Sequence, residues 1–279
     1  MGVLFQLAAY GCGLLTIAVL VMMFQLGRPL FVDGQFFSLL SQVWQPGQQL
    51  YGIYPMIIGS IRISFLALAL SFPVSLGTAF LAAGLAPRPM QRWVLAMVRL
   101  MAGIPTVVYG FVAIFLLVPL VREHVSRGSG LNILTASLVL AVLIAPTMVV
   151  FFVNGLRGVD QSYCRATDAL GATAVQRLLY LQLPQGWPTI VSGVIMGLGR
   201  AMGDTLVSLM VAGNSIGVPT SIVDSARTLT AHIALVIAAD FASMEFASIF
   251  ACGLVLYLFT MAVVIGLRML VHLRTGSDR

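Results

Sequence analysis

The chain has 279 residues, of which 59% are hydrophobic and only 9% are charged, and its mean hydropathy is +1.02. A soluble domain carries about a quarter charged residues, so these values exclude a soluble fold, whereas a lipid bilayer solvates the excess apolar surface. All 15 basic residues are arginines that stand singly between apolar runs, which excludes a nucleic-acid-binding stripe despite the net charge of +6.

Six apolar segments are long enough to span a membrane, because a spanning helix needs about 20 apolar residues. They are Val3–Leu26, Ile57–Leu85, Val94–Val121, Leu131–Val153, Ile190–Ala212 and Phe246–Leu270. The first has no basic leader and is longer than the apolar core of a signal peptide, so we expect an uncleaved helix. The shorter stretch Leu229–Ala239 is predicted to be interfacial or re-entrant. The fold class is therefore all-α, a polytopic membrane protein with about six transmembrane helices.

The arginines also predict how the chain is divided and oriented. Nine arginines lie on the side of the second and fourth connections and the C-terminus, four lie on the other side, and two lie within spans. The positive-inside rule then predicts that both termini are cytoplasmic. Residues 1–56 form the first helix and an external connection, residues 57–271 form the core with a cytoplasmic loop at 154–189, and residues 272–279 form a cytoplasmic tail.

The loop at 154–189 has the pattern of an amphipathic helix lying outside the bilayer. Its apolar residues recur at helical spacing and its charges stand between them: Ala166, Ala169, Leu170, Ala172, Val175, Leu178 and Leu179 with Arg165, Asp168 and Arg177. Leu183-Pro184 and Trp187-Pro188 are expected to exclude a continuous helix and to turn the chain before it re-enters the membrane. Such a helix rests on lipid headgroups or docks into the groove of a cytoplasmic partner.

Two charges, Arg200 and Asp204, stand in the middle of the fifth apolar segment. Charges at that depth cost at least a few kcal/mol and normally face a bundle interior or an aqueous path. Their spacing of four residues predicts one helical face and an ion pair. Such a pair serves packing alone, or Arg200 meets an anionic substrate while Asp204 holds the guanidinium, whose planar fork matches oxyanions.

Other polar residues follow in the same region. Thr205 and Ser208 supply hydroxyls that complete an anion's shell or that bond back to helix carbonyls. Arg227, in a cluster with Thr228, Thr230 and His232, contacts the anion or anchors the chain at the interface. The three cysteines are far apart, so no metal site is expected, and a chain without lysine lacks the phosphate loop of an ATPase. We expect no cofactor in this chain and no enzyme activity, with ATP bound by a separate subunit.

The stretch from Arg165 to Pro184 resembles the signature loop of binding-protein-dependent ABC importer permeases, written EAA, three residues, glycine, nine residues, I-x-L-P. Arg165 stands where the family has glutamate. The resemblance implies the type I importer permease fold and a coupling helix that docks on a cytoplasmic ATPase dimer. The coupling residues it implies are Arg165, Ala166, Asp168, Gly171, Ala172, Leu183 and Pro184.

Four further stretches, 102–111, 197–205, 211–214 and 227–234, resemble the PstC-type permeases of phosphate importers. The resemblance implies a PstA-type second permease, an extracytoplasmic phosphate-binding protein and a prokaryotic inner membrane. It also implies that Arg200 and the acidic position 204, usually glutamate in the family, serve phosphate passage. The alternatives are another oxyanion such as molybdate, sulfate or phosphonate, a channel subunit without energy coupling, and a membrane-embedded enzyme acting on lipid.

Overall fold

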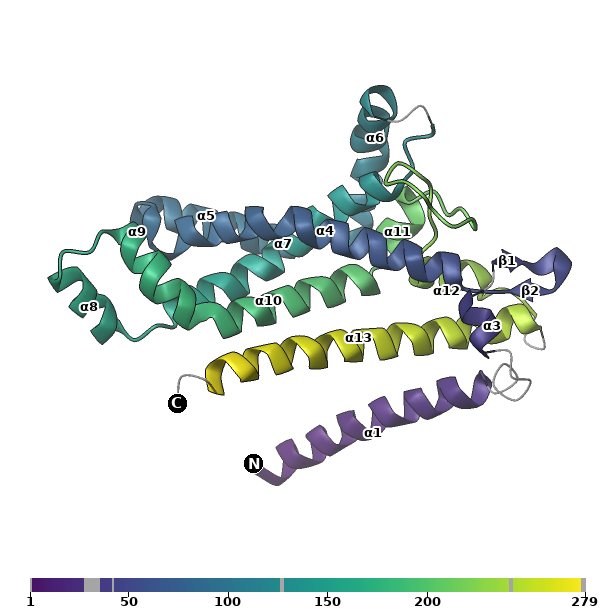
Figure 1. The fold of residues 1–279 in the computed structure, drawn as a ribbon, viewed down its shortest axis with the longest axis horizontal. Helices are drawn as coiled ribbons and strands as arrows, with labels where there is room; N and C mark the ends of the chain where they lie inside the picture. Colours follow the sequence, from purple (N-terminus) through teal and green to yellow (C-terminus); the bar gives the residue numbers. More distant parts are fainter. Residues whose placement is uncertain (1, 28–35, 42, 126–127, 241–242, 277–279) are drawn as a thin grey trace.

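The computed structural model describes residues 2–27, 36–41, 43–125, 128–240 and 243–276. Figure 1 shows long helices lying side by side along the molecule, with α6 (Thr106–His124) projecting away from them. Five helices in the described ranges are long and apolar enough to cross a membrane: Phe5–Leu26, Tyr54–Leu85, Thr106–His124, Ile133–Arg157 and Met244–Met269. The all-α membrane fold is therefore confirmed.

Four of the predicted spans agree with single long helices to within a few residues. They are α1 (Gly2–Leu26), α4 (Tyr54–Phe80) with the π-helical turn Leu81–Leu85, α7 (Ile133–Arg157) and α13 (Met244–Gly276). Residues 272–276, predicted as part of a tail, continue α13, and residues 277–279 lie outside the described ranges. The external connection predicted before residue 56 includes residues 28–35 and 42, which also lie outside them.

The third predicted span, Val94–Val121, is wrong as a single helix. The chain forms α5 (Arg88–Ala102) and then α6, with the break at Gly103-Ile104-Pro105. A residue that precedes proline is driven out of the helical region by the proline ring, and Pro105 itself has extended backbone angles. The break lets α6 leave the direction of α5, as Figure 1 shows.

The fifth predicted span, Ile190–Ala212, is also divided. It forms the end of α10 (Leu183–Gly203) and the short α11 (Leu206–Val211), and Asp204 between them is extended. Glycine is a weak helix former and aspartate favours the residue before a helix, so Gly203-Asp204 ends one helix and starts the next. The consequence for the predicted charge pair is described below.

The predicted turn at Leu183-Pro184 is wrong, because the chain stays helical there. α9 (Ala174–Arg177) continues through a π-helical turn, Leu178–Gln182, directly into α10. The Leu183 N–H bonds to the Leu178 carbonyl across the wider turn. Pro184 is in the first turn of α10, where its missing N–H costs little, so the irregular turn accommodates the proline without ending the helix.

The core is built around α7, which packs between α4 and α10. Gly155 of α7 and Gly186 of α10 lie so close that a Cβ on either would meet the other's backbone at 2.8–2.9 Å. Gly193 and Gly197 of α10 lie equally close to side chains of α7, whereas Gly199 and Gly203 face open space. The first part of this glycine run therefore serves close helix packing.

A second, smaller apolar cluster closes the opposite end of the molecule from α8 (Gln161–Ala169) and α9. It combines α3 (Phe36–Ser41), the hairpin of β1 (Trp44–Gln45) and β2 (Leu50–Tyr51), α12 (Leu229–Val236) and the start of α13. The short stretch predicted at Leu229–Ala239 is thus a short helix packed in this cluster. The beginning of α1 and the end of α13 point toward the α8 end (Figure 1).

Candidate functional site

Arg200 lies in the last turn of α10 and is half-buried. Its Nη1 donates a hydrogen bond to Thr147 Oγ1 on α7 at 2.9 Å. Thr147 follows Pro146 inside the most deeply buried span, and sequence reasoning missed it, although a hydroxyl beside a proline in an apolar helix is a usable signal. The described residues give this guanidinium one hydrogen bond, while it carries five N–H donors.

The predicted ion pair between Arg200 and Asp204 is wrong. No nitrogen–oxygen distance of 4.0 Å or less joins them; within the described ranges the recorded pair is Arg177 with Asp168. Because Asp204 is extended, residues 200 and 204 no longer share a helical face. The Asp204 carboxylate instead accepts the N–H of Val207 at 2.8 Å and so caps α11.

Asp204 also fixes the break through its backbone. Its carbonyl accepts the hydroxyl of Ser208 at 3.2 Å and that of Thr230 on α12 at 2.9 Å. Ser208 therefore bonds back to its own helix rather than facing a path. Thr205 is half-buried, and its hydroxyl has no partner among the described residues. The side chains left with bonding capacity at this break are Arg200 and Thr205.

Arg227 lies in a separate polar cluster beyond the break. Its Nε donates to the Asn214 carbonyl at 3.2 Å, and its Nη1 lies 3.5 Å from His232 Nδ1. The fully buried His232 ring packs edge-on against Trp44, with ring centroids 4.3 Å apart. The structure does not bring Arg227 to Arg200 directly; the two clusters are joined through α12, where Thr230 bonds to Asp204.

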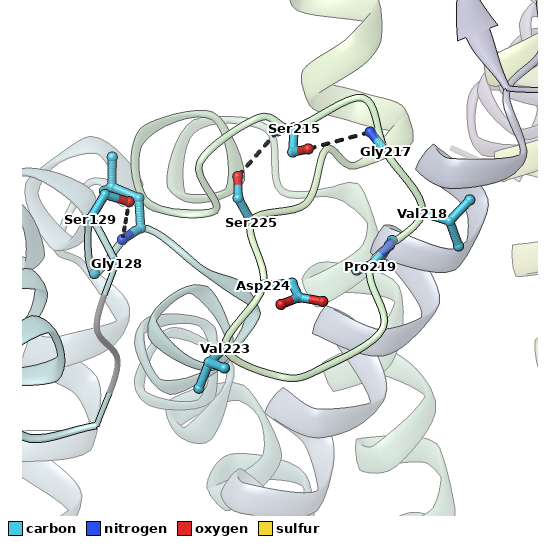
Figure 2. A pocket seen from close by; sticks show the side chains of 11 residues that line it. Gly128, Ser129, Ser215, Gly217, Val218, Pro219, Val223, Asp224 and Ser225 are labelled. Atoms are coloured by element: carbon cyan, nitrogen blue, oxygen red, sulfur yellow. Dashed lines mark hydrogen bonds between the residues drawn. The ribbon is translucent and has the colours of Figure 1, made fainter.

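The loop before Arg227 surrounds a pocket of about 380 Å³, shown in Figure 2. Arg62 of α4 reaches this loop and donates to the Pro219 carbonyl at 2.7 Å, which explains one of the two arginines found within spans. Hydrogen bonds from Ser221 and Thr220 lower the pKa of the Asp224 carboxyl below its ordinary value. Sequence reasoning did not single out this loop, because its contacts join segments far apart in the chain.

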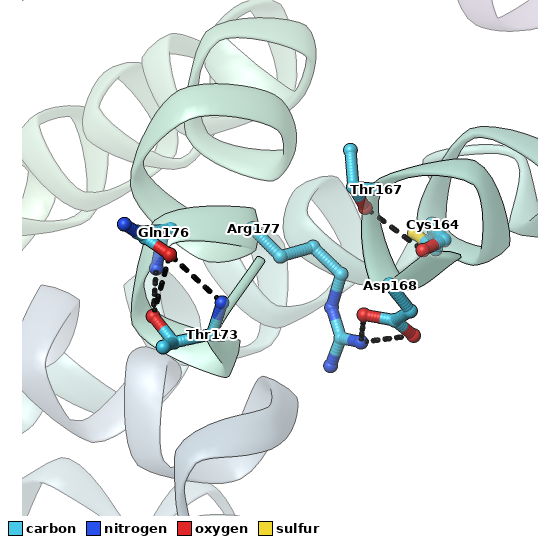
Figure 3. Close-up of polar contacts among 6 residues, drawn as sticks. All are labelled: Cys164, Thr167, Asp168, Thr173, Gln176 and Arg177. Carbon is cyan, nitrogen blue, oxygen red and sulfur yellow. Dashed lines mark hydrogen bonds and ion pairs between the residues drawn. The ribbon is translucent and has the colours of Figure 1, made fainter. Parts of the chain in front are cut away.

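Five of the predicted coupling residues lie in the connection between α7 and α10, whereas Leu183 and Pro184 begin α10. Figure 3 shows the polar contacts of this connection, with Asp168 among them. Arg177 binds Asp168 with Nη1 at 2.5 and 2.7 Å from the two carboxylate oxygens, which joins α9 to α8. Thr173 and Gln176 form a capping box at the start of α9. Gly171, between the two helices, has φ of +79°, a left-handed conformation that glycine adopts without strain. The predicted single amphipathic helix is thus two short helices around Gly171.

The remaining coupling residues differ in exposure. Arg165 and Ala166 are exposed on α8, Ala172 is half-buried beside Gly171, and Leu183 packs against the main core while Pro184 is exposed. Large apolar side chains are exposed on and beside α8 and α9: Tyr163 on α8 is 56% exposed and Val175 on α9 is 50% exposed. Leu170, just after α8, is 86% exposed, and Tyr180, in the π-helical turn after α9, is 81% exposed. Apolar groups this exposed outside the spans indicate a surface for a protein partner.

The comparisons with known proteins agree with this architecture. Residues 75–274 match the family described as "Binding-protein-dependent transport system inner membrane component". The probable ABC transporter permease protein YqgH of Bacillus subtilis (strain 168) is 32% identical over 235 residues, 83% of this chain and 76% of that protein. The phosphate transport system permease protein PstC of Pasteurella multocida (strain Pm70) is 30% identical over 250 residues, 82% of this chain and 77% of that protein.

Solved structures show the same fold. A chain of the MetNI methionine ABC transporter, in an inward-facing conformation, superposes with a TM-score of 0.59 at 19% identity. The superposition covers 76% of this chain and 92% of that one. At this identity the likeness establishes the fold of an ABC importer permease.

Proposed function

The chain belongs to the family of binding-protein-dependent transport system inner membrane components, and we propose that it is the permease subunit of an ATP-driven phosphate importer. In this proposal it forms half of a translocation pathway that works by alternating access. Relatives named as PstC phosphate permeases support the choice of phosphate, since they match more than four-fifths of the chain.

The observation that supports an oxyanion substrate best is the state of Arg200. Its guanidinium lies at a helix break within the membrane region, half-exposed, with a single hydrogen bond to Thr147. A planar guanidinium offers two parallel N–H donors to a tetrahedral oxyanion and keeps its proton at any working pH. We assign the substrate contact to Arg200, with the unpartnered hydroxyl of Thr205 completing the anion's shell.

Asp204 and Arg227 take different parts in this pathway. Asp204 holds the break open by capping α11, and its negative charge near Arg200 limits how tightly an anion is held, which conduction requires. Arg227 lies toward the end opposite α8 and supplies positive charge where an anion enters from outside. Arg200, Asp204, Thr205 and Arg227 remain our proposed pathway residues.

The exposed face of α8 and α9 is proposed to dock on an ATPase dimer, which supplies the energy because this chain has no nucleotide loop. A PstA-type permease is proposed to complete the pathway, and an extracytoplasmic phosphate-binding protein to deliver substrate at the opposite end. With α8 in the cytoplasm, the start of α1 and the end of α13 are cytoplasmic too, since they point the same way. This orientation agrees with the arginine distribution.

The test is reconstitution of the chain in liposomes with its ATPase, second permease and binding protein. Radiolabelled phosphate uptake driven by ATP is expected, and an excess of unlabelled phosphate should suppress it while molybdate, sulfate and phosphonate do not. Uptake of another oxyanion in preference to phosphate would transfer the assignment to that anion. Uptake independent of ATP would replace the importer with an uncoupled channel.

A further inference from the structure

Apart from the substrate pathway, the structure contains an arginine-lined cavity of about 620 Å³ at the end that carries α8 and α9. Its walls come from four helices, of which α5 is distant in sequence from α7, α8 and α9. They contribute Arg88 and Gln91 from α5, Arg157 from α7, Arg165 and Asp168 from α8, and Arg177 from α9. Four guanidinium groups and one carboxylate therefore face one cavity.

The positive charge in this cavity is only partly neutralised. Asp168 is bound by Arg177, and Arg157 uses its Nη2 on the Ala82 carbonyl and on Gln91 Oε1. Arg88 and Arg165 have no hydrogen bond or ion pair with any described residue. The Nε of Arg177 is buried and also lacks a partner. Donors from Arg88 and Arg165 are thus available to a group that is not part of this chain.

The place of the cavity indicates which anion it takes. Arg157 is the last residue of the α7 span, so the cavity lies where the membrane-spanning part ends. α5, which begins at Arg88, exposes Trp93 and Met90 next to that end. Tryptophan is enriched at the level of lipid headgroups, and arginine near a span end extends toward the same level. Headgroup phosphates lie at this depth.

The chemistry agrees with the place. A tetrahedral phosphate group accepts hydrogen bonds from several guanidinium forks at once, whereas a single carboxylate satisfies one fork. Clusters of basic residues on the cytoplasmic side of spans attract anionic lipids, and pockets of this kind between helices hold their headgroups. A volume of about 620 Å³ exceeds what a bare phosphate ion fills and accommodates a glycerophosphate headgroup.

We propose that this cavity binds a phosphate group through Arg88 and Arg165, with Arg157 and Arg177 behind them. The group comes from an anionic phospholipid or from free inorganic phosphate, which share the recognised chemistry. Bound there, it bridges α5 to α8 and fixes the α8–α9 connection against the spanning helices. The site is distinct from Arg200, although its place on the cytoplasmic side rests on the proposed orientation and Arg165 is also one of the proposed coupling residues.

The experiment uses the complete transporter carrying Arg200→Gln, so that binding in the pathway does not contribute. Native mass spectrometry counts retained phosphatidylglycerol against phosphatidylcholine, and the thermal midpoint is measured with and without inorganic phosphate. The test variants are Arg165→Glu and Arg88→Gln, with Arg165→Gln as a milder change. Arg92→Glu is the matched control, since Arg92 is exposed on α5 and does not line the cavity.

If the site is a lipid site, the background protein retains at least about fivefold more phosphatidylglycerol than phosphatidylcholine, and Arg165→Glu and Arg88→Gln lose that preference while Arg92→Glu keeps it. If the source is free phosphate, millimolar phosphate raises the thermal midpoint of the background and of Arg92→Glu, and not that of the cavity variants. Equal behaviour of the cavity variants and Arg92→Glu in both assays overturns the proposal. The proposal is also overturned if neither lipid nor phosphate responds and the cavity variants lose only the ATPase subunit in the mass spectra, because the cavity would then be a contact for that protein.

Discussion

Two of the helix breaks, at Gly203–Thr205 and at Leu170–Thr173, differ in how completely the backbone and polar side chains at the break find hydrogen-bond partners. The break at Gly203–Thr205, which we call the buried break, is centred on Asp204, which is 8% exposed, and the Asp204 carboxylate and carbonyl both have partners within the chain. At Leu170–Thr173 the break is exposed, and Leu170 is 86% exposed to solvent.

This difference follows from the surroundings of each break, which are the membrane interior for one and water for the other. Inside a membrane an unsatisfied backbone group costs several kcal/mol, so a helix break there survives only if neighbouring groups supply its hydrogen bonds. Outside, water satisfies the backbone, and exposed apolar side chains are tolerated until a partner covers them. At the buried break only Arg200 and Thr205 keep hydrogen-bonding capacity, whereas the exposed break is where we propose contact with another protein.

The largest effect is expected from Arg200→Gln. Glutamine keeps an N–H donor but loses the charge, and its donor is two bonds closer to the backbone than the Nη1 that bonds Thr147. A hydrogen bond to a charged group contributes about 1.5–3 kcal/mol, so uptake should fall by about 100-fold. Assembly should be unchanged, because the Arg200 side chain makes one hydrogen bond within the described part of the fold. Radiolabelled phosphate uptake in liposomes measures the loss, and co-purification of all subunits checks assembly.

Arg92→Gln is the control for this prediction, since it removes an exposed arginine outside the break. Normal uptake by Arg200→Gln would remove the substrate role from the buried break and leave it a packing feature.

At the exposed break, Gly171→Asp should weaken coupling with little cost to folding. A side chain at φ of +79° costs about 1–2 kcal/mol locally, and the new charge stands beside the apolar face of Leu170. We expect ATPase co-purification to fall by about tenfold while the thermal midpoint of the isolated permease changes little. Leu170→Ala should weaken the same association without altering the turn.

Leu15→Ala on α1 provides the matched control, because Leu15 is also an exposed leucine, at 69%, but lies in a candidate membrane span far from the α8–α9 connection in sequence. Undiminished association and ATP turnover in both Gly171→Asp and Leu170→Ala would contradict docking at this face.

Two substitutions at Asp204 distinguish helix capping from a contribution of the negative charge. Asp204→Ala leaves the Val207 N–H unsatisfied and should destabilise the protein by about 1–2 kcal/mol, measured by thermal unfolding in detergent. Asp204→Asn keeps an oxygen that accepts this N–H and should lose much less. Equal destabilisation by both changes would show that the negative charge, rather than the cap, stabilises the break.

The spans and their order could be read from the sequence because hydropathy reports directly on burial in lipid. The breaks could not, because they depend on local competition: Pro105 ended α5, and Asp204 capped a helix instead of continuing one. Pro184, conversely, was expected to end a helix and did not, since a π-helical turn accommodates it. One-dimensional patterns do not show which of these outcomes the surrounding packing allows.

The candidate site was predictable to the same extent. The motif located Arg200, Asp204 and Gly171, but the partners that define their roles come from other helices. Thr147 lies 53 positions before Arg200, and Thr230 lies 26 positions after Asp204. Such contacts are set by how α7, α10 and α12 pack, so the ion pair inferred from spacing alone was replaced by two separate hydrogen-bonded arrangements.

The smallest effect is expected at Asp160, the exposed counterpart of Asp204. Its carboxylate accepts the Ser162 N–H at 2.8 Å and caps α8, and this bond lowers the pKa of the carboxyl below its ordinary value. A group with a lowered pKa in the folded state stabilises above its ordinary pKa, and that contribution disappears as the pH falls through the lowered value. Protection of the first α8 amides against hydrogen exchange, corrected for intrinsic rates, should therefore decrease in acid.

In Asp160→Asn the protection should not change with pH over this range. The rest of the fold should be unaffected, because water can bond the backbone N–H groups at this end of the helix. A pH response of the same size in Asp160→Asn would assign the change to another carboxylate, and a global loss of protection would show that the exposed connection is coupled to the core as firmly as the buried break.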